Sequence, residues 1–112
     1  SVREAGIEKV IASHLLKWIH FQQDVEGRDV ELRYFRDTDG REVDFLVVER
    51  RNPILMIEAK WGDQDVDRGL RYLKGKFPSV HAWQLSAVGR KDYVTPDGIR
   101  VSPALPFLAQ LI

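Results

Sequence analysis

The sequence predicts an α/β domain in which helices flank a mixed central sheet. The expected element order is α-β-β-β-α-β, followed by a small C-terminal strand and helix. Three observations predict this fold. The N-terminal stretch has the apolar periodicity of a helix, three short strand-like runs follow with turn signals between them, and a second helical pattern precedes a fourth strand-like run. A helix between two strands implies a right-handed crossover, so we expect the third and fourth strands to be parallel.

The first helix is expected from about Ala5 to Phe21. Placed at about 100° per residue, this stretch has one broad apolar face. The face comprises Ile7, Val10, Ile11, Leu15, Trp18, Ile19 and Phe21. Glu8 lies near the middle of that face, where an unpaired carboxylate costs several kcal/mol. We therefore expect Glu8 to have a partner on the core side of the helix.

The remaining elements follow from apolar runs bounded by turn residues. Strands are expected at Val30–Arg36, Glu42–Glu49 and Ile54–Lys60, with turns at Asp37–Gly40 and Arg50–Pro53. A second helix, capped by Asp63 or Asp65 and ending near Phe77, would bury Val66, Leu70, Leu73 and Phe77. Later elements are expected at Val80–Leu85, Lys91–Thr95, Ile99–Ser102 and Pro103–Leu111. All belong to one predicted domain, residues 1–112.

Composition limits the possible functions. The absence of Cys excludes disulfide frameworks and zinc–thiolate sites. The 17 basic and 17 acidic residues balance, so tight binding to DNA by this chain alone is not expected from net charge. The denser basic stretches are Arg68–Lys76 and Arg90–Lys91. Neither a secretory signal pattern nor an apolar run of about 18 residues occurs, so we expect a cytoplasmic location without a membrane partner.

The chemistry centres on acids in otherwise apolar strands. Glu58 and Lys60 are two residues apart on one strand and therefore share a face. If the strands pair so that Asp44 faces Glu58, and Val48 faces Ile54, two carboxylates stand about 5 Å apart. A register shifted by one residue would instead place these acids on opposite faces. In the first register a Mg²⁺ ion would relieve the repulsion, and Lys60 would polarise a water or offset phosphate charge.

Each of these residues also has a purely structural interpretation. Glu58 and Lys60 can form a surface ion pair, Asp44 can be a turn residue, and Glu8 can form a salt bridge with an arginine. All three acids interrupt otherwise apolar patterns, which favours a shared site.

The arrangement resembles the PD-(D/E)xK nuclease superfamily. Asp44 precedes Glu58-Ala59-Lys60, and an inward-facing Glu8 lies on the preceding helix. More specific segments resemble one branch, the uncharacterised C-terminal domain appended to prokaryotic AAA+-type P-loop ATPases. These segments are Gly6–Glu8, Tyr34–Phe45, Ile57–Trp61 and Pro103–Leu111. Val43 stands where the superfamily often has Pro, and no catalytic group is missing.

The resemblance implies a restriction-endonuclease-like fold with Asp44, Glu58 and Glu8 as ligands of Mg²⁺ or Mn²⁺ and Lys60 as the catalytic lysine. It implies a nuclease acting on nucleic acid, most naturally DNA, and a P-loop ATPase domain as partner in the same full-length protein. The chain itself lacks a Walker A motif, so we do not expect it to hydrolyse ATP. The resemblance implies that the domain is a piece of a larger ATPase. The alternative is a catalytically inactive nuclease-fold module that binds DNA or protein and regulates the ATPase.

Other residues are weaker candidates. Gln64 and Gln84 are possible neighbours of the site, and Trp61 can either line a cleft or pack against the sheet. Arg68 and Arg71 can contact phosphate, although a solvated helix face explains them equally simply.

Overall fold

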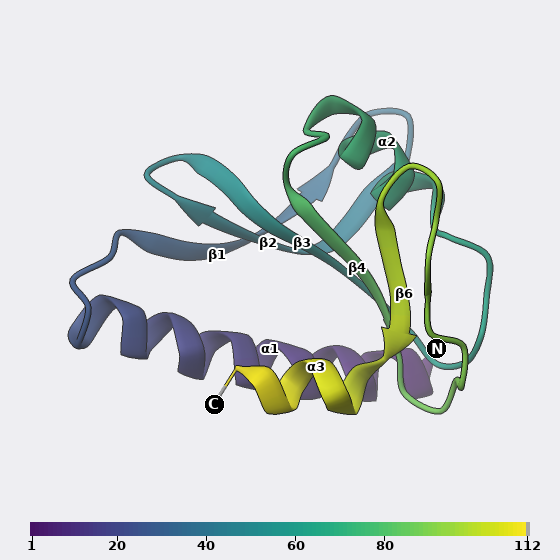
Figure 1. Cartoon of the computed structure of the whole chain (residues 1–112), viewed down its shortest axis with the longest axis horizontal. Coiled ribbons are helices and arrows are strands. Elements are labelled where there is room, and N and C mark those ends of the chain that lie inside the picture. The colour runs from purple at the N-terminus through teal and green to yellow at the C-terminus, as the bar shows by residue number, and fades with distance from the viewer. Residues whose placement is uncertain (112) are drawn as a thin grey trace.

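A computed structural model describes residues 1–111, so Ile112, the last residue of the predicted domain, lies outside the described residues. Figure 1 shows a sheet with helices on both faces. The helices are α1 (Val2–Asp24), α2 (Arg68–Lys76) and α3 (Ala104–Gln110). The strands are β1 (Val30–Arg36), β2 (Glu42–Glu49), β3 (Asn52–Lys60), β4 (His81–Ser86), β5 (Tyr93–Val94) and β6 (Ile99–Pro103).

The described strands form one mixed sheet of six strands in the order β1-β2-β3-β4-β6-β5. The first three strands are antiparallel, whereas β4 is parallel to both β3 and β6. The predicted fold class and the predicted crossover through α2 are therefore confirmed. The short β5 pairs with β6 at the edge of the sheet.

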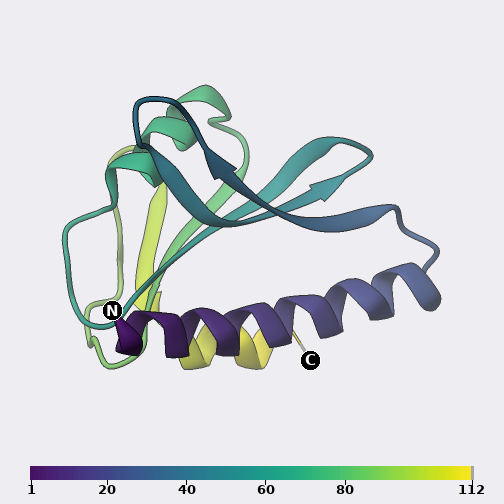
Figure 2. The same cartoon turned by 180° about the vertical axis from the view of Figure 1, so that it is seen from behind.

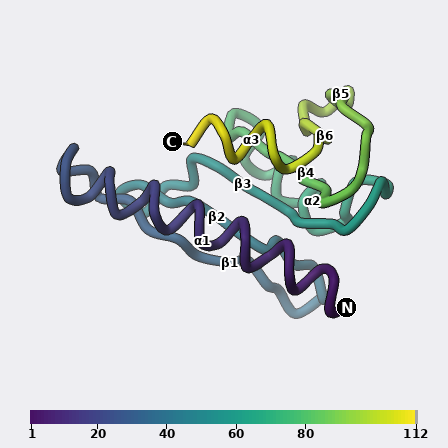
Figure 3. Tube along the Cα trace, turned by 90° about the horizontal axis from the view of Figure 1, so that it is seen from below, coloured from purple at the N-terminus to yellow at the C-terminus, as the bar shows by residue number. Residues whose placement is uncertain are grey.

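The helices α1 and α3 lie side by side on one face of the sheet (Figure 2 and Figure 3). The buried stripe of α1 consists of Ile7, Ile11, Leu15 and Ile19. It packs against β-strand residues such as Val47, Ile57 and Leu85 and against Phe107 of α3. The stripe is narrower than predicted: Val10 and Phe21, expected on the buried face, are exposed, because the sheet contacts only one side of the helix.

The helix α2 covers part of the opposite face, where Leu70 and Leu73 pack against Val43 and Met56. It begins at Arg68, later than predicted. Its first turn packs closely against the backbone of β2. The approach is so close that a Cβ on Gly69 would collide with the main chain of Glu42. Phe77, predicted to be buried, is 40% exposed because it lies just beyond the end of this short helix.

The turn between β2 and β3 is tighter than predicted. Glu49 pairs with Asn52, so only Arg50 and Arg51 connect the strands, and both have positive φ. Two-residue hairpins of this kind favour Asn-Gly, which adopts positive φ readily. Arginine at such a position costs about 1–2 kcal/mol per residue.

No helix within residues 1–111 is both long enough and apolar enough to cross a membrane.

Candidate metal-binding site between the strands

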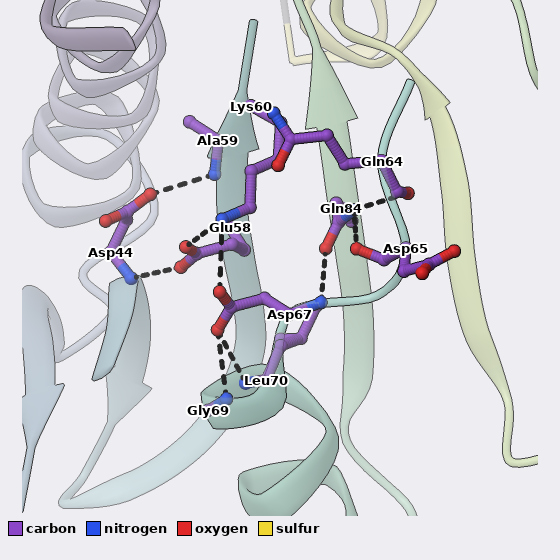
Figure 4. Close-up of polar contacts among 10 residues, drawn as sticks. All are labelled: Asp44, Glu58, Ala59, Lys60, Gln64, Asp65, Asp67, Gly69, Leu70 and Gln84. Atoms are coloured by element: carbon purple, nitrogen blue, oxygen red, sulfur yellow. Dashed lines mark hydrogen bonds and ion pairs between the residues drawn. The ribbon is translucent and has the colours of Figure 1, made fainter. Parts of the chain in front are cut away.

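The candidate site lies where β2 and β3 diverge. Their ladder extends from Glu49–Asn52 to Phe45–Ile57. Beyond it, side chains replace ladder bonds: the amide of Asp44 donates to Glu58 Oε1 at 3.0 Å, and the amide of Ala59 donates to Asp44 Oδ2 at 2.9 Å (Figure 4). The two acids thus hold the ends of the strands together across the gap.

The predicted register is correct along most of the β2–β3 ladder and wrong at its turn. Phe45 pairs with Ile57 and Val47 with Leu55, which places Asp44 beside Glu58 as expected. Val48, however, pairs with Pro53 and not with Ile54. The shift arises because the connecting turn has two residues, so β3 takes up an irregularity next to Val48.

A bulge in β2 sets the direction of Asp44. Arg33 pairs with Leu46, and Phe35 pairs with Val43, so β2 has one residue more than β1 in this interval. As a result Val43 and Leu46 both contact the α2 side of the core despite their odd spacing. Bulges commonly re-aim a side chain in this way. Here the interrupted alternation places Asp44 at the gap between the strands.

Lys60 lies among the acids. Its Nζ is 3.1 Å from Asp67 Oδ1 and 3.5 Å from Glu58 Oε2, and its side chain is 15% exposed. Burial alone would disfavour the ammonium, but the hydrogen bond to Asp67 and the charges of Asp67 and Glu58 outweigh it and raise the pKa of Lys60. Lys60 is therefore a fixed cation at neutral pH.

Asp67 is the site residue that sequence reasoning missed. Its Oδ2 caps α2 by accepting from the amides of Gly69 and Leu70, while its Oδ1 accepts from Lys60. The residues predicted to cap α2, Asp63 and Asp65, do not cap it. Asp63 instead accepts hydrogen bonds from backbone amides of the loop that follows β4. The signal was present, since an Asp one residue before a helical turn is a common cap.

Gln84, a candidate neighbour, anchors this cap. Its side chain is buried on β4, accepts from the amide of Asp67 at 2.8 Å, and donates to the carbonyls of Gln64 and Asp65 (Figure 4). Gln84 therefore fixes the loop that presents Asp67 to Lys60. Gln64 takes part only through its backbone, and its side chain is exposed.

Glu8 reaches the same pocket from α1. It is half-buried, and burial followed by the negative charge of Asp44 raises its pKa, while Lys60 acts in the opposite direction. The alternative of a salt bridge with an arginine is not realised, because no ion pair within residues 1–111 includes Glu8. The structure thus brings all four predicted residues to one place.

The four residues line a cavity of about 280 Å³ with an excess of acids. The acidic lining residues are Glu4, Glu8, Glu42, Asp44, Glu58 and Asp67, and the basic ones are Arg41, Lys60 and Arg68. Such a lining attracts cations.

The pKa values of Asp44 and Glu58 are both raised above their ordinary values. Burial, then the charges of Asp44 and Asp67, raise the pKa of Glu58 to about 8. Burial also raises the pKa of Asp44, although hydrogen bonds from Ala59 and Glu58 and the charge of Lys60 oppose the rise. Two adjacent carboxyl groups, one buried and one half-buried, do not readily ionise together. A divalent cation between them would stabilise their ionised forms.

The oxygen donors of this site fit Mg²⁺ or Mn²⁺, with the protein supplying only a few of the ligands of the ion. Asp44 and Glu58 offer hard carboxylate oxygens, which these ions prefer. Within residues 1–111, no three His, Cys, Asp or Glu side chains are grouped closely enough to hold a metal together. Mg²⁺ commonly binds through one or two carboxylates and retains several waters. Glu8 would accordingly contact a bound water.

The remaining candidates take structural positions. Trp61 is not part of the cavity lining, and the guanidinium of Arg3 lies 5.3 Å from its ring centre. Arg71 pairs with Asp97 at 3.2 Å on an exposed surface. Arg68 does line the cavity, where it donates to the carbonyl of Asp39 at 3.0 Å.

Residues 4–105 match a family described as a domain of unknown function (DUF4143), which covers most of the chain. No curated protein matches the chain. No solved structure matches it either.

Proposed function

The chain belongs to the DUF4143 family, and we propose that it is a metal-dependent nuclease domain that hydrolyses phosphodiester bonds in DNA. The observation that carries the proposal is the buried carboxylate of Glu58 and the half-buried carboxylate of Asp44, held side by side where two strands part, with Lys60 next to them. The resemblance to PD-(D/E)xK nucleases rests on the same three residues and agrees with this arrangement.

The residues divide the work by their chemistry. Asp44 and Glu58 would hold Mg²⁺ or Mn²⁺, which when bound supplies Lewis acidity and a water of lowered pKa. Lys60, fixed as a cation by Asp67, offsets the charge that develops on a phosphate. Glu8 accepts a proton or hydrogen bond from water at the edge of the cavity.

The proposal extends to the setting of the domain. We place it in the cytoplasm, acting on DNA beside a P-loop ATPase domain of the same full-length protein. The net charge of zero supports this arrangement, because a partner domain would supply part of the affinity for DNA.

The test is cleavage of fluorescent DNA with Mn²⁺, combined with calorimetric titration of Mn²⁺. We expect the double change Asp44→Asn, Glu58→Gln to abolish metal binding. We expect Lys60→Ala to preserve metal binding but to lower the cleavage rate by about 100-fold or more. Unchanged metal affinity in the double variant would contradict the proposed site.

The second candidate is an inactive nuclease-fold module that regulates the ATPase. The absence of a three-acid group within residues 1–111 and the pairing of Lys60 with Asp67 favour it. Wild-type protein that binds DNA but does not cleave single-stranded, double-stranded or branched DNA with Mn²⁺ would favour this module.

A further inference from the structure

A groove separate from the acidic cavity lies between α2 and the strands β1, β2 and β3. Its volume is about 710 Å³, within the usual range of ligand-binding pockets. The floor is apolar and includes Leu46 and Val48, and Phe77 adds an aromatic ring that is 40% exposed. The groove exists because α2 is short and leaves the outer part of this sheet face uncovered (Figure 1).

The charged residues that line this groove are all basic, although Asp29 and Glu31 lie beside Arg33 and Arg51 in the adjoining pocket. Arg33, Arg51 and Lys76 line it, and no acid within residues 1–111 does. Arg33 pairs with Glu31, but no ion pair among the described residues includes Arg51 or Lys76. In a chain with equal numbers of acids and bases, this one-sided lining is a local anion-attracting surface.

The two-residue turn places Arg51 at the rim of the groove. Its φ is 70°, and Arg50 beside it has φ 51°, so both residues lie in the left-handed region where Gly is preferred. Because Arg50 has the same strain and does not line the groove, the strain belongs to the turn, and Arg51 differs from Arg50 in its place at the groove.

The groove lies next to the acidic cavity. Arg41 lines the cavity, and its guanidinium lies 3.5 Å from the ring centre of Tyr72, which lines the groove. Strand β2 also spans both sites, with Asp44 at the cavity and Val48 in the groove. Four residues of strand correspond to about 13 Å.

We propose that this groove binds single-stranded nucleic acid and leads it to the acidic cavity; the second part rests on the proposed nuclease function, whereas the binding itself does not. A ligand must present negative charge to the rim and apolar surface to the floor. A single strand does both, since its phosphates face the cations and its unstacked bases cover Leu46, Val48 and Phe77. A duplex keeps its bases inside and would leave the floor bare. An acidic peptide offers charge with less flat apolar surface.

The experiment measures fluorescence anisotropy of a labelled thymidine oligonucleotide of about 12 residues. EDTA is present throughout, so binding is measured without metal or cleavage. The variants are Arg51→Gly, Lys76→Gln and their combination. Arg51→Gly removes a charge while relieving strained backbone, so we expect its Tm to rise and a loss of affinity cannot reflect unfolding. Arg50→Gly is the matched control, since it removes the same charge from the same turn but outside the groove.

We expect the combined variant to lose about tenfold or more in affinity and about 1.4 in the slope of log K against log salt, because each lost phosphate contact lowers the slope by about 0.7. The Arg50→Gly control should bind within about twofold of wild type. Equal losses in Arg50→Gly and Arg51→Gly would overturn the proposal, as would equal affinity for a duplex of the same length. Tighter binding of a poly-glutamate peptide would overturn it in favour of an acidic protein partner. Binding in EDTA that is followed by no cleavage after Mn²⁺ is added in excess would contradict only the nuclease function.

Discussion

Gln84 is the buried residue on which the position of Asp67 depends. Its amide group makes three hydrogen bonds, one from the amide of Asp67 and two to the carbonyls of Gln64 and Asp65. These are main-chain groups of a loop without regular structure. The side chain of Gln84 therefore supplies the hydrogen bonds that a neighbouring strand would otherwise give to the backbone of this loop. Through Asp67, the same side chain acts on the orientation of Lys60.

Gln84→Met keeps the size of this side chain and removes its hydrogen bonds. We expect the free energy of unfolding to fall by about 2–4 kcal/mol, because several polar groups of the loop lose their partner. Urea unfolding measures this. Gln64→Met is the control and should change stability by less than about 0.5 kcal/mol, since the exposed side chain of Gln64 takes no part in the contact. Similar losses in both variants would show that Gln84 does not hold the loop.

At the scale of elements, the site depends on how closely α2 approaches β2. Gly69 lies in the first turn of α2, two residues after the cap at Asp67, and the backbone of Glu42 occupies the space that a side chain would need. The contact is between two main chains, so neither side can move without shifting the helix. This approach places the cap within reach of Lys60.

Two glycines in α2 offer a matched comparison. Gly69→Ala should destabilise the protein by about 2 kcal/mol or more, because the new Cβ collides with the backbone of β2. Gly75→Ala, in the same helix, meets nothing within 4 Å and should stabilise by up to about 1 kcal/mol through helix propensity alone. Thermal unfolding of both variants tests this. A stabilising Gly69→Ala would mean that α2 does not abut β2.

The sequence predicts the elements because they follow from local patterns. The meeting of the two acids could be predicted only for one of two registers, because β2 and β3 are apolar over most of their length and a bulge interrupts the alternation of β2 at Asp44. The cap at Asp67 was not predicted, because Asp63, Asp65 and Asp67 are equivalent candidates by local criteria. The contact from Gln84, distant in sequence, selects among them. The two-residue turn was missed because Arg-Arg is an unusual sequence for it.

At the scale of the whole molecule, a net charge of zero conceals a separation of charge. Acids concentrate in the cavity at the divergence of β2 and β3, while the residues that line the groove on the α2 face of the sheet include only basic charged residues among those described. A polyanion would be repelled by the cavity until a cation neutralises it and attracted by the groove at all times. Metal binding would then determine whether a nucleic acid held in the groove can enter the site.

The carboxylates of the cavity also make the stability of the metal-free protein depend on pH. Glu58 keeps its proton in the folded protein up to pH about 8, whereas in the unfolded chain it ionises near its ordinary value of 4.5. Between these values the unfolded state binds fewer protons, so stability falls as pH rises from about 4.5 to about 8. The raised pKa values of Asp44 and Glu8 act in the same direction. The lowered pKa of Asp63 affects stability only at more acidic pH, outside this window.

We therefore expect urea unfolding in EDTA to show a loss on the order of 3 kcal/mol between pH 5 and pH 8. Glu58→Gln removes the titrating group while keeping its size, so the slope of stability against pH should be much smaller in this variant. Mn²⁺ should restore stability more at pH 8 than at pH 5, because it binds the ionised carboxylates and not their protonated forms. Stability that is constant or rising between pH 5 and pH 8, or a slope unchanged by Glu58→Gln, would show that neither burial nor the charge of Asp44 raises the pKa of Glu58 in the folded protein. The metal would then have no unfavourable charge to relieve.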